Sequence, residues 1–232
     1  LKSGFSQGKG SALLRKILVT SQFIISIAIL IGTIIIYQQL KYMQSKDLGF
    51  DKENLLVIER GFSGKNQKFL LDEIKKHPGV INVTISTSIP GKLNNNMTYG
   101  IEGRERTNSY LMRTFWTDDN FDETYKLRLL EGRYLSSDFA SDSSAAVINA
   151  MAMKQCGIDD ISKTRFLFPD LHGNYKFYQV VGVVRDFNIE SLHSAIKPCI
   201  FLLQPNRWNW GYVTVRVKPG EIKQTVDSLV SL

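Results

Sequence analysis

The chain has 232 residues, 43% hydrophobic and 22% charged, and this ordinary globular composition excludes a wholly disordered or low-complexity fibrous protein. Its formal charge of +7 arises from 29 basic and 22 acidic residues. Four of the 29 basic residues, Lys2, Lys9, Arg15 and Lys16, precede the first apolar stretch, which leaves 25 against 22 acidic residues. So balanced a surface lacks the electrostatic footprint of nucleic-acid binding, and we expect no nucleic acid among the partners.

An uncharged apolar run spans residues 17–37 and reads ILVTSQFIISIAILIGTIIIY. It matches the roughly 20 residues that a helix needs to cross a hydrocarbon layer about 30 Å thick. Basic residues come before the run and mixed charges follow it. The positive-inside rule therefore predicts a cytoplasmic segment over 1–16, a transmembrane helix over 17–37 and an extracytoplasmic remainder over 38–232. A cleaved signal peptide is disfavoured, because its apolar region would be shorter.

The helix is expected to continue beyond the lipid. Residues 11–16 before the run and residues 38–47 after it contain neither proline nor glycine, and Gly49 is the first residue after the run that favours a stop. A helix over residues 11–48 would be about 57 Å long, so residues 38–50 would form a stalk outside the membrane. The alternative is that Tyr37 and Tyr42 anchor the interface and the helix frays after Lys41.

One face of the transmembrane helix carries small and polar side chains. Gln22, Ser26, Ala28, Gly32 and Thr33 are candidates for packing against other membrane helices, because small residues permit close approach and polar ones hydrogen-bond between helices. A second interpretation stays open at this point. The hydroxyls of Ser26 and Thr33 could bond to the preceding turn of their own helix.

The residues after the stalk predict an α+β fold. Residues 54–59 and 80–86 read as strands, and residues 65–77 between them read as an amphipathic helix ended by Pro78-Gly79. A strand at 212–218 and a helix at 222–230 repeat this pattern without a closing strand. In the first strand–helix–strand segment, the apolar positions expected to face the core are Phe69, Leu70, Ile74, Ile81, Val83 and Ile85.

Two such units on either side of a long insertion predict a two-lobed domain. The first lobe, ferredoxin-like or porter-like, is assigned to residues 51–90 and 176–232, with strands near 177–187 and 200–204. The second, a β-rich insertion, is assigned to residues 91–175. In it, residues 111–116 and 145–149 read as apolar segments, and Asn149 is expected to cap a short helix that ends at Gly157.

No catalytic or metal-binding constellation is apparent in the sequence. His77, His172 and His193 are far apart, and Cys156 and Cys199 do not form a CxxC motif. The acidic residues 118–123 lack the glycine and the final glutamate of a calcium loop, although a looser ion site using Asp118, Asp122 or Asp142 stays open. We therefore expect no enzyme activity, no metal and no cofactor. Whether the two cysteines form a disulfide is also open.

Three segments together resemble one known family. They are residues 14–58, residues 121–149 with the sequence FDETYKLRLLEGRYLSSDFASDSSAAVIN, and residues 178–198 with the sequence YQVVGVVRDFNIESLHSAIKP. The combination is similar to the MacB/FtsX-type ABC transporter permeases of Gram-negative bacteria. The resemblance implies that the chain is one transmembrane helix followed by a MacB-like periplasmic core domain, from the second half of a duplicated permease.

The resemblance also implies a function and a location in the bacterial inner membrane. Such permeases relay the motion of a cytoplasmic ABC ATPase through a stalk helix to the periplasm, in efflux or mechanotransmission. The partners implied are that ATPase, other permease helices or a second permease copy, and membrane lipid, while a periplasmic adaptor or substrate is left open. The alternative is the extracytoplasmic sensory domain of a membrane receptor.

The family supplies no catalytic residues to transfer to this chain. Its tract VVGVVRDF contains Gly182, Asp186 and Phe187, which we regard as a candidate structural signature. Gly182 would permit close packing in a buried strand, and Asp186 would cap the turn that follows.

Overall fold

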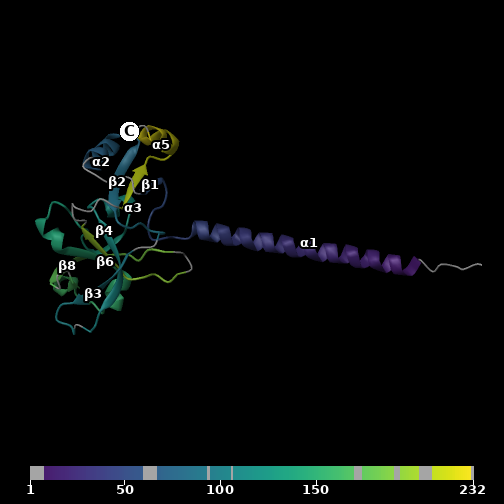
Figure 1. The fold of residues 1–232 in the computed structure, drawn as a ribbon, viewed down its shortest axis with the longest axis horizontal. Helices are drawn as coiled ribbons and strands as arrows, with labels where there is room; N and C mark the ends of the chain where they lie inside the picture. Colours follow the sequence, from purple (N-terminus) through teal and green to yellow (C-terminus); the bar gives the residue numbers. More distant parts are fainter. Residues whose placement is uncertain are drawn as a thin grey trace, which may run out of the picture. The chain divides into compact units, whose positions relative to one another are not determined.

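In a computed structural model the chain divides into two compact units, Leu1–Asp47 and Leu48–Leu232. The structure describes residues 8–59, 67–92, 95–105, 107–169, 174–190, 194–203 and 211–230. Figure 1 shows a single long helix in the first unit and a mixed domain of helices and strands in the second. The fold class is therefore α+β, as predicted.

The first unit contains one helix, α1 (Gly8–Ser45), of 38 residues. Its length is about 57 Å at about 1.5 Å per residue. Residues Ala12–Met43 within it are long and apolar enough to cross a membrane. Phe23, Ile24 and Leu30 are 64%, 62% and 61% exposed, as expected for a helix whose apolar sides need lipid or other helices around them. The predicted continuation past residue 37 is confirmed, although the helix ends at Ser45 rather than at residue 48.

The second unit, the α+β domain, starts and ends with a three-stranded part. It comprises β1 (Leu55–Glu59), α2 (Gln67–Lys76), β2 (Val80–Ser86), β10 (Tyr212–Val217) and α5 (Ile222–Val230). Strand β10 lies between β1 and β2 and is antiparallel to both, which is the split arrangement of a ferredoxin-like fold. Both helices lie near β1 and β2 in Figure 1, and their apolar sides share one core with Val83, Val213, Val215 and Val217.

Two predicted core positions in this part are wrong. Phe69 is 66% exposed, because Leu71 and Ile74 form the core face of α2. Ile81 is 55% exposed, because the register shifts by one residue and Val217 of β10 pairs with Val80. The extra residue is a β-bulge, and it turns Val80 toward the core in place of Ile81. The side chain of Leu70 lies outside the described residues.

The inserted part lies between β2 and β10 in the chain. Its elements are β3 (Asn95–Ile101), β4 (Tyr110–Thr117), α3 (Phe121–Tyr125), β5 (Leu129–Gly132), β6 (Ala145–Asn149), α4 (Ala150–Gln155), β7 (Arg165–Pro169), β8 (Tyr175–Val184) and β9 (Cys199–Leu203). Two short 3-10 turns are at Ala140–Ser144 and Ile161–Lys163. The strands run in the order β4-β3-β7-β8-β6-β9, and β9 pairs again with β4, so the sheet closes on itself.

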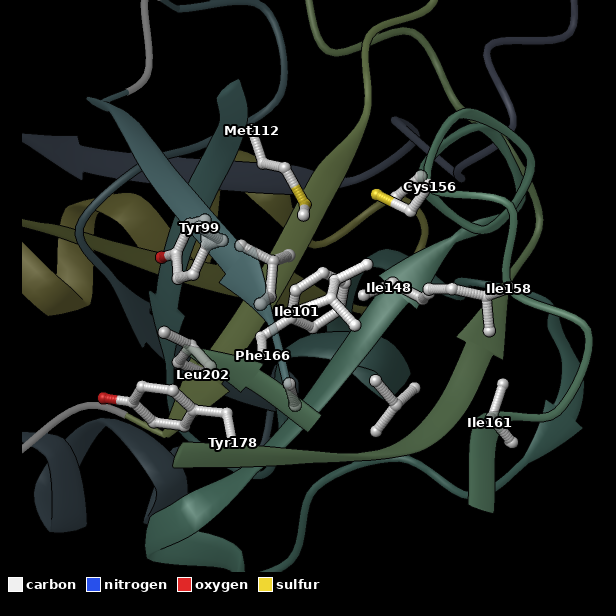
Figure 2. Packing of buried hydrophobic residues seen from close by; sticks show 14 of the residues in the cluster. Tyr99, Ile101, Met112, Ile148, Cys156, Ile158, Ile161, Phe166, Tyr178 and Leu202 are labelled. Atoms are coloured by element: carbon white, nitrogen blue, oxygen red, sulfur yellow. The ribbon is translucent and has the colours of Figure 1, made fainter. Parts of the chain in front are cut away.

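Apolar side chains from these strands and from the helices and loops between them fill two clusters. The first includes Tyr99, Met112, Ile148, Phe166 and Leu202, which converge in Figure 2. The second contains the rings of Phe115, Phe121, Phe187 and Phe201 on the other side of β4 and β9. Asn149 caps α4 by accepting a 3.0 Å hydrogen bond from the Ala152 amide, and Gly157 follows with a φ of 57°, as predicted.

The two parts of the domain share little of the sheet. Strands β2 and β4 pair at one position, Ser86 opposite Thr117. We expected the region of strands β8 and β9 in the first lobe, but these strands pair with the inserted part instead, because β8 joins β5, β6 and β7 and β9 joins β4 and β6. A nearly continuous apolar strand needs cover on both faces, and β8 has it, because Tyr178, Val180 and Val183 belong to the first cluster and Val184 to the second. The lobe boundaries 51–90, 91–175 and 176–232 stay a prediction.

Candidate functional site where the chain enters the α+β domain

The first residues of the α+β domain, Leu48–Asn54, are here called the exit segment, because they follow α1 along the chain. They are the first part of the domain that the chain forms after α1 and the two residues Lys46 and Asp47. Gly49 and Asn54 have positive φ angles of 80° and 55°, so the backbone turns sharply at both ends of the segment. The manner in which the domain holds this segment decides whether a displacement of α1 is transmitted or absorbed.

On one side, the exit segment packs against the backbone of residues 186–188. The carbonyl oxygen of Leu48 accepts hydrogen bonds from the backbone amide of Asn188 at 2.8 Å and from its side-chain amide at 3.4 Å. A Cβ at Gly49 would lie 2.5 Å from the Asp186 carbonyl oxygen and 2.7 Å from the Phe187 Cα. Glycine is therefore required here both by the φ angle and by the close approach of two backbones.

Aromatic rings continue this contact into the core. The half-buried ring of Phe50 lies edge-on to Tyr125 and Phe187, with centroids 5.9 Å and 6.4 Å away. Phe187 is fully buried and contacts Phe115 and Phe201 at 6.0 Å and 5.9 Å. Such edge-to-face contacts add to the stability gained from burial. Phe50 therefore anchors the exit segment in the second aromatic cluster.

On the other side, the exit segment is held by a buried arginine. Arg216 of β10 is 4% exposed, and its guanidinium donates to the carbonyl oxygens of Asp51 at 2.8 Å, Glu53 at 2.9 Å and Thr124 at 2.7 Å. The Asp51 carboxylate lies 3.3 Å from the same guanidinium. A planar fork of donors suits this set of carbonyl groups, and a lysine would satisfy fewer of them.

Asp51 has a second charged neighbour. The Lys126 ammonium lies 2.6 Å from its carboxylate, and this hydrogen bond, with a further contribution from Arg216, holds the pKa of Asp51 below its ordinary value. The backbone amide of Asp51 donates to the Tyr125 carbonyl oxygen at 2.9 Å, and that of Val217 donates to the Asn54 carbonyl oxygen at 2.9 Å. The exit segment is thus fixed along its length by α3 and β10.

Two of the signature residues of the VVGVVRDF tract, Asp186 and Phe187, contact the exit segment, and the third, Gly182, lies in β8. Gly182 is opposite Gly132 in the β5–β8 pair, and a Cβ at Gly182 would overlap the Arg133 carbonyl group, so glycine lets the two strands approach closely. The Asp186 carboxylate accepts 2.8 Å hydrogen bonds from the Asn149 side-chain amide and the Met151 backbone amide. It therefore caps α4, which lies elsewhere in the sequence, rather than the following turn as we expected.

The residues predicted to pack against other membrane helices are all on α1. The Thr33 hydroxyl donates to the Ile29 carbonyl oxygen at 2.8 Å, which is the local bond that the sequence left open. A Cβ at Gly32 would meet no atom within 4 Å. Packing of Gln22, Ser26, Ala28, Gly32 and Thr33 against other helices stays a prediction.

Two of the carboxylates considered for ion binding, those of Asp118 and Asp142, are engaged by other protein groups. The Asp118 carboxylate accepts hydrogen bonds from the Thr84 hydroxyl and the Ile85 amide, whereas Asp142 pairs with Arg133. Cys156 and Cys199 are buried free thiols. The His77 Nδ1 accepts a 3.1 Å hydrogen bond from the Gly79 amide, while His172 and His193 lie outside the described residues. Within the described ranges no three histidine, cysteine or acidic side chains gather as metal ligands.

Sequence reasoning missed the main residues of the site. Gly49 was noted as a helix stop, and its close approach to residues 186 and 187 has no local signal. Arg216 did have a local signal in the sequence, because an arginine interrupts the β-branched residues of the strand YVTVRV. Its position in the strand places it with Thr214 on the face away from α2 and α5, where a buried charge needs partners.

Two solved structures share the arrangement of this domain. The periplasmic region of MacB from Actinobacillus actinomycetemcomitans has a TM-score of 0.54 at 16% sequence identity, over 79% of this chain and 85% of that one. The extracellular domain of the ABC-type transporter YknZ from Gram-positive bacteria has a TM-score of 0.51 at 17% identity, over 74% and 88%. No curated protein sequence matches. The α+β domain therefore shares its fold with these two domains.

The sequence then identifies the family. The family model of the MacB-like periplasmic core domain matches residues 18–231, and the chain belongs to that family, which occurs in ABC-transporter-type permeases. The resemblance drawn from three segments is confirmed. All three meet at the exit segment, since residues 14–58 contain it, residues 121–149 supply Tyr125, and residues 178–198 supply Asp186 and Asn188.

Proposed function

We propose that the chain is part of the permease subunit of an ABC-type efflux or mechanotransmission system. In this proposal α1 relays the motion of a cytoplasmic ATPase to the α+β domain. The chain would lie in the bacterial inner membrane with residues 1–16 in the cytoplasm and residues 38–232 in the periplasm. The ATPase, other permease helices or a second permease copy, and lipid would be its partners. The family match supports the transporter setting, and the exit segment supports the mechanical part.

The observation that carries the proposal is the continuity from helix to domain. Helix α1 is about 57 Å long, nearly twice the hydrocarbon thickness of about 30 Å, so several turns are available outside the lipid. Only Lys46 and Asp47 separate its last residue, Ser45, from the exit segment. That segment is held by the buried Arg216 fork and by the backbone contact at Gly49. A rigid helix followed by an anchored segment transmits displacement, whereas a flexible linker would absorb it.

The proposed topology is tested by labelling cysteines in intact cells. Lys163→Cys places a thiol where the native side chain is 83% exposed, and Arg15→Cys places one before the predicted span. The native Cys156 and Cys199 are buried, so their labelling background is low. A membrane-impermeant maleimide should label Lys163→Cys in intact cells and Arg15→Cys only after lysis. The reverse pattern would refute the topology.

The relay is tested with the full-length protein purified together with its ATPase. A four-residue Gly-Ser insertion between Lys46 and Asp47 should leave co-purification intact but abolish any ATP-dependent change in hydrogen exchange of the α+β domain. The matched control carries the same insertion after Gly103, in a turn where a Cβ would meet nothing within 4 Å, and should keep the change. Failure to co-purify with any ATPase would favour the receptor alternative.

A further inference from the structure

Asp186, in the segment between β8 and β9 of the inserted part, contacts both the exit segment and α4, through different atoms. Its backbone carbonyl oxygen faces Gly49 so closely that a Cβ there would come within 2.5 Å. Its carboxylate accepts hydrogen bonds from the Met151 backbone amide and the Asn149 side-chain amide, each at 2.8 Å. One residue therefore connects the backbone of the exit segment to the first turn of α4.

Asn149 extends this connection to a further strand. It is fully buried, and its side-chain oxygen accepts from the backbone amides of Ala152 at 3.0 Å and Cys199 at 2.9 Å. Its side-chain nitrogen donates to Asp186 and to the Lys197 carbonyl oxygen at 3.0 Å. All four hydrogen-bonding positions of the amide are occupied, so the side chain has no freedom to turn. Asn149 thus ties Asp186 to α4 and to the start of β9.

The elements tied together in this way line the first apolar cluster. Ala152 and Cys156 of the α4 region and Ile200 of β9 all belong to it. Figure 2 shows the Cys156 side chain directed toward this cluster. Protein interiors are densely packed, so a shift of α4 has to be accommodated by the strands beneath it.

The other connection of the exit segment uses separate residues. Arg216 belongs to β10, and the cluster beside that strand is formed by Val213, Val215 and Val217 with residues of α2 and α5. The hydrogen bonds of Arg216 go to Asp51, Glu53 and Thr124, none of which is bonded to Asp186 or Asn149 by the contacts above. Besides the ring contacts of Phe50, the exit segment is therefore connected to α4 and β9 through Asp186 and Asn149, and to β10 through Arg216.

We propose that Asp186 and Asn149 are positioning residues that make the inserted part follow the exit segment through α4 and β9, while the three-stranded part follows separately through Arg216. The proposal rests on the proposed function, since the relay supplies the displacement. It adds that α4 and β9 on the one hand, and the three-stranded part on the other, receive that displacement through different contacts. Removing the Asp186 carboxylate should therefore uncouple α4 and β9 and leave the three-stranded part responsive.

The experiment uses hydrogen exchange with mass spectrometry on the full-length protein in lipid nanodiscs, without ATPase. Gly49→Ala perturbs the exit segment, and peptides covering residues 150–158 and 212–218 report on the two parts. In the otherwise native protein, Gly49→Ala should raise exchange in both peptides by about threefold or more, as expected for coupled contacts. In an Asp186→Ala background, the additional effect of Gly49→Ala should vanish at 150–158 and persist at 212–218.

A control variant distinguishes a positioning role of Asp186 from the simple loss of a helix cap. Asp160→Ala removes another capping carboxylate of the inserted part, which accepts a hydrogen bond from the Ser162 amide. In the Asp160→Ala background, Gly49→Ala should still raise exchange at residues 150–158. Asp186→Asn keeps an acceptor oxygen and should also preserve the effect. If Gly49→Ala unfolds the domain, Phe50→Leu gives a milder perturbation with the same expected pattern.

Two results would overturn the proposal. One is an undiminished effect of Gly49→Ala on residues 150–158 in the Asp186→Ala background. The other is the absence of any effect on those residues in the otherwise native protein. Both exchange measurements are made without the ATPase. They can therefore contradict the role of Asp186 while co-purification with an ATPase still supports the proposed function, or support that role while co-purification fails.

Discussion

The two sides of the exit segment hold it by different physical means. On the β10 side a buried guanidinium and an ammonium bind carbonyl groups and the Asp51 carboxylate. On the opposite side the backbone of Gly49 lies against that of Asp186 and Phe187, and no charged group is required. The comparison teaches that the two contacts make opposite demands on the sequence. The contact with β10 requires particular charged side chains, whereas the contact at Gly49 requires a residue without a side chain.

The largest expected effect comes from removing the buried arginine. Arg216→Met should destabilise the α+β domain by about 3 kcal/mol or more, because three carbonyl groups and Asp51 lose their donor in a buried site. Urea unfolding of the full chain in detergent, followed by tryptophan fluorescence, measures the change. Arg165→Met is the control, since that arginine pairs with Glu102 at the surface with its side chain 49% exposed, and it should cost less than about 1 kcal/mol. Equal losses in the two variants would contradict the buried fork.

The backbone side is tested by adding a single methyl group. Gly49→Ala should cost about 2 to 3 kcal/mol, because a positive φ is strained for alanine and the new Cβ would overlap residues 186 and 187. Gly103→Ala is a closely matched control, with a φ of 79° against 80° and no neighbour within 4 Å. Gly103→Ala should lower the stability by only about 1 to 2 kcal/mol, which is the conformational cost of alanine at a positive φ. The difference between the two variants in urea unfolding measures the close contact.

The carboxylates of Asp118 and Asp51 should make the stability of the α+β domain depend on pH in opposite directions. Burial raises the pKa of Asp118 to about 6, against the lowering effect of hydrogen bonds from Thr84, Ile85 and Asn120. The folded state therefore binds this proton more tightly than the unfolded chain, and stability should increase as the pH falls from 7.5 to 5. Asp51 has a lowered pKa, so its contribution is lost only below its ordinary value of 3.8.

The gain from Asp118 over this range is on the order of 1 kcal/mol. Asp122, whose pKa burial also raises to about 6, adds a change of the same sign. Asp118→Asn should reduce the gain between pH 7.5 and pH 5, whereas Asp51→Asn should leave it unchanged. Urea unfolding at the two pH values measures both, and an undiminished gain in Asp118→Asn would exclude this carboxylate as a source.

The smallest effect is expected at Lys126. Its side chain is 60% exposed, so its pairing with Asp51 is screened by solvent and Lys126→Ala should cost about 0.5 kcal/mol or less. That loss should shrink further in 0.5 M salt, whereas the loss in Arg216→Met should change little. A salt-independent loss at Lys126 would mean that the charged side is more buried in solution than the structure indicates.

The sequence by itself determined the elements whose signals are local. The uncharged run of residues 17–37 required a long apolar helix, and the alternation in VINVTIS and YVTVRV required strands at β2 and β10. Asn149 could be assigned as a helix cap because the acceptor and the amide that it binds are three residues apart. Periodicity and capping act over a few residues, so they can be recognised without the fold.

Only the tertiary structure decided which of these elements meet. The partners of Arg216 lie 92 to 165 positions away in the chain, and the bulge that exposes Ile81 depends on the register with β10. The closure of the inserted part through the β4–β9 pair, and the contact of Gly49 with residues 186 and 187, are likewise long-range. A strand pattern specifies which side chains face a core but leaves its neighbour unspecified, because many strands offer equivalent hydrogen bonds, and packing of the whole domain selects among them.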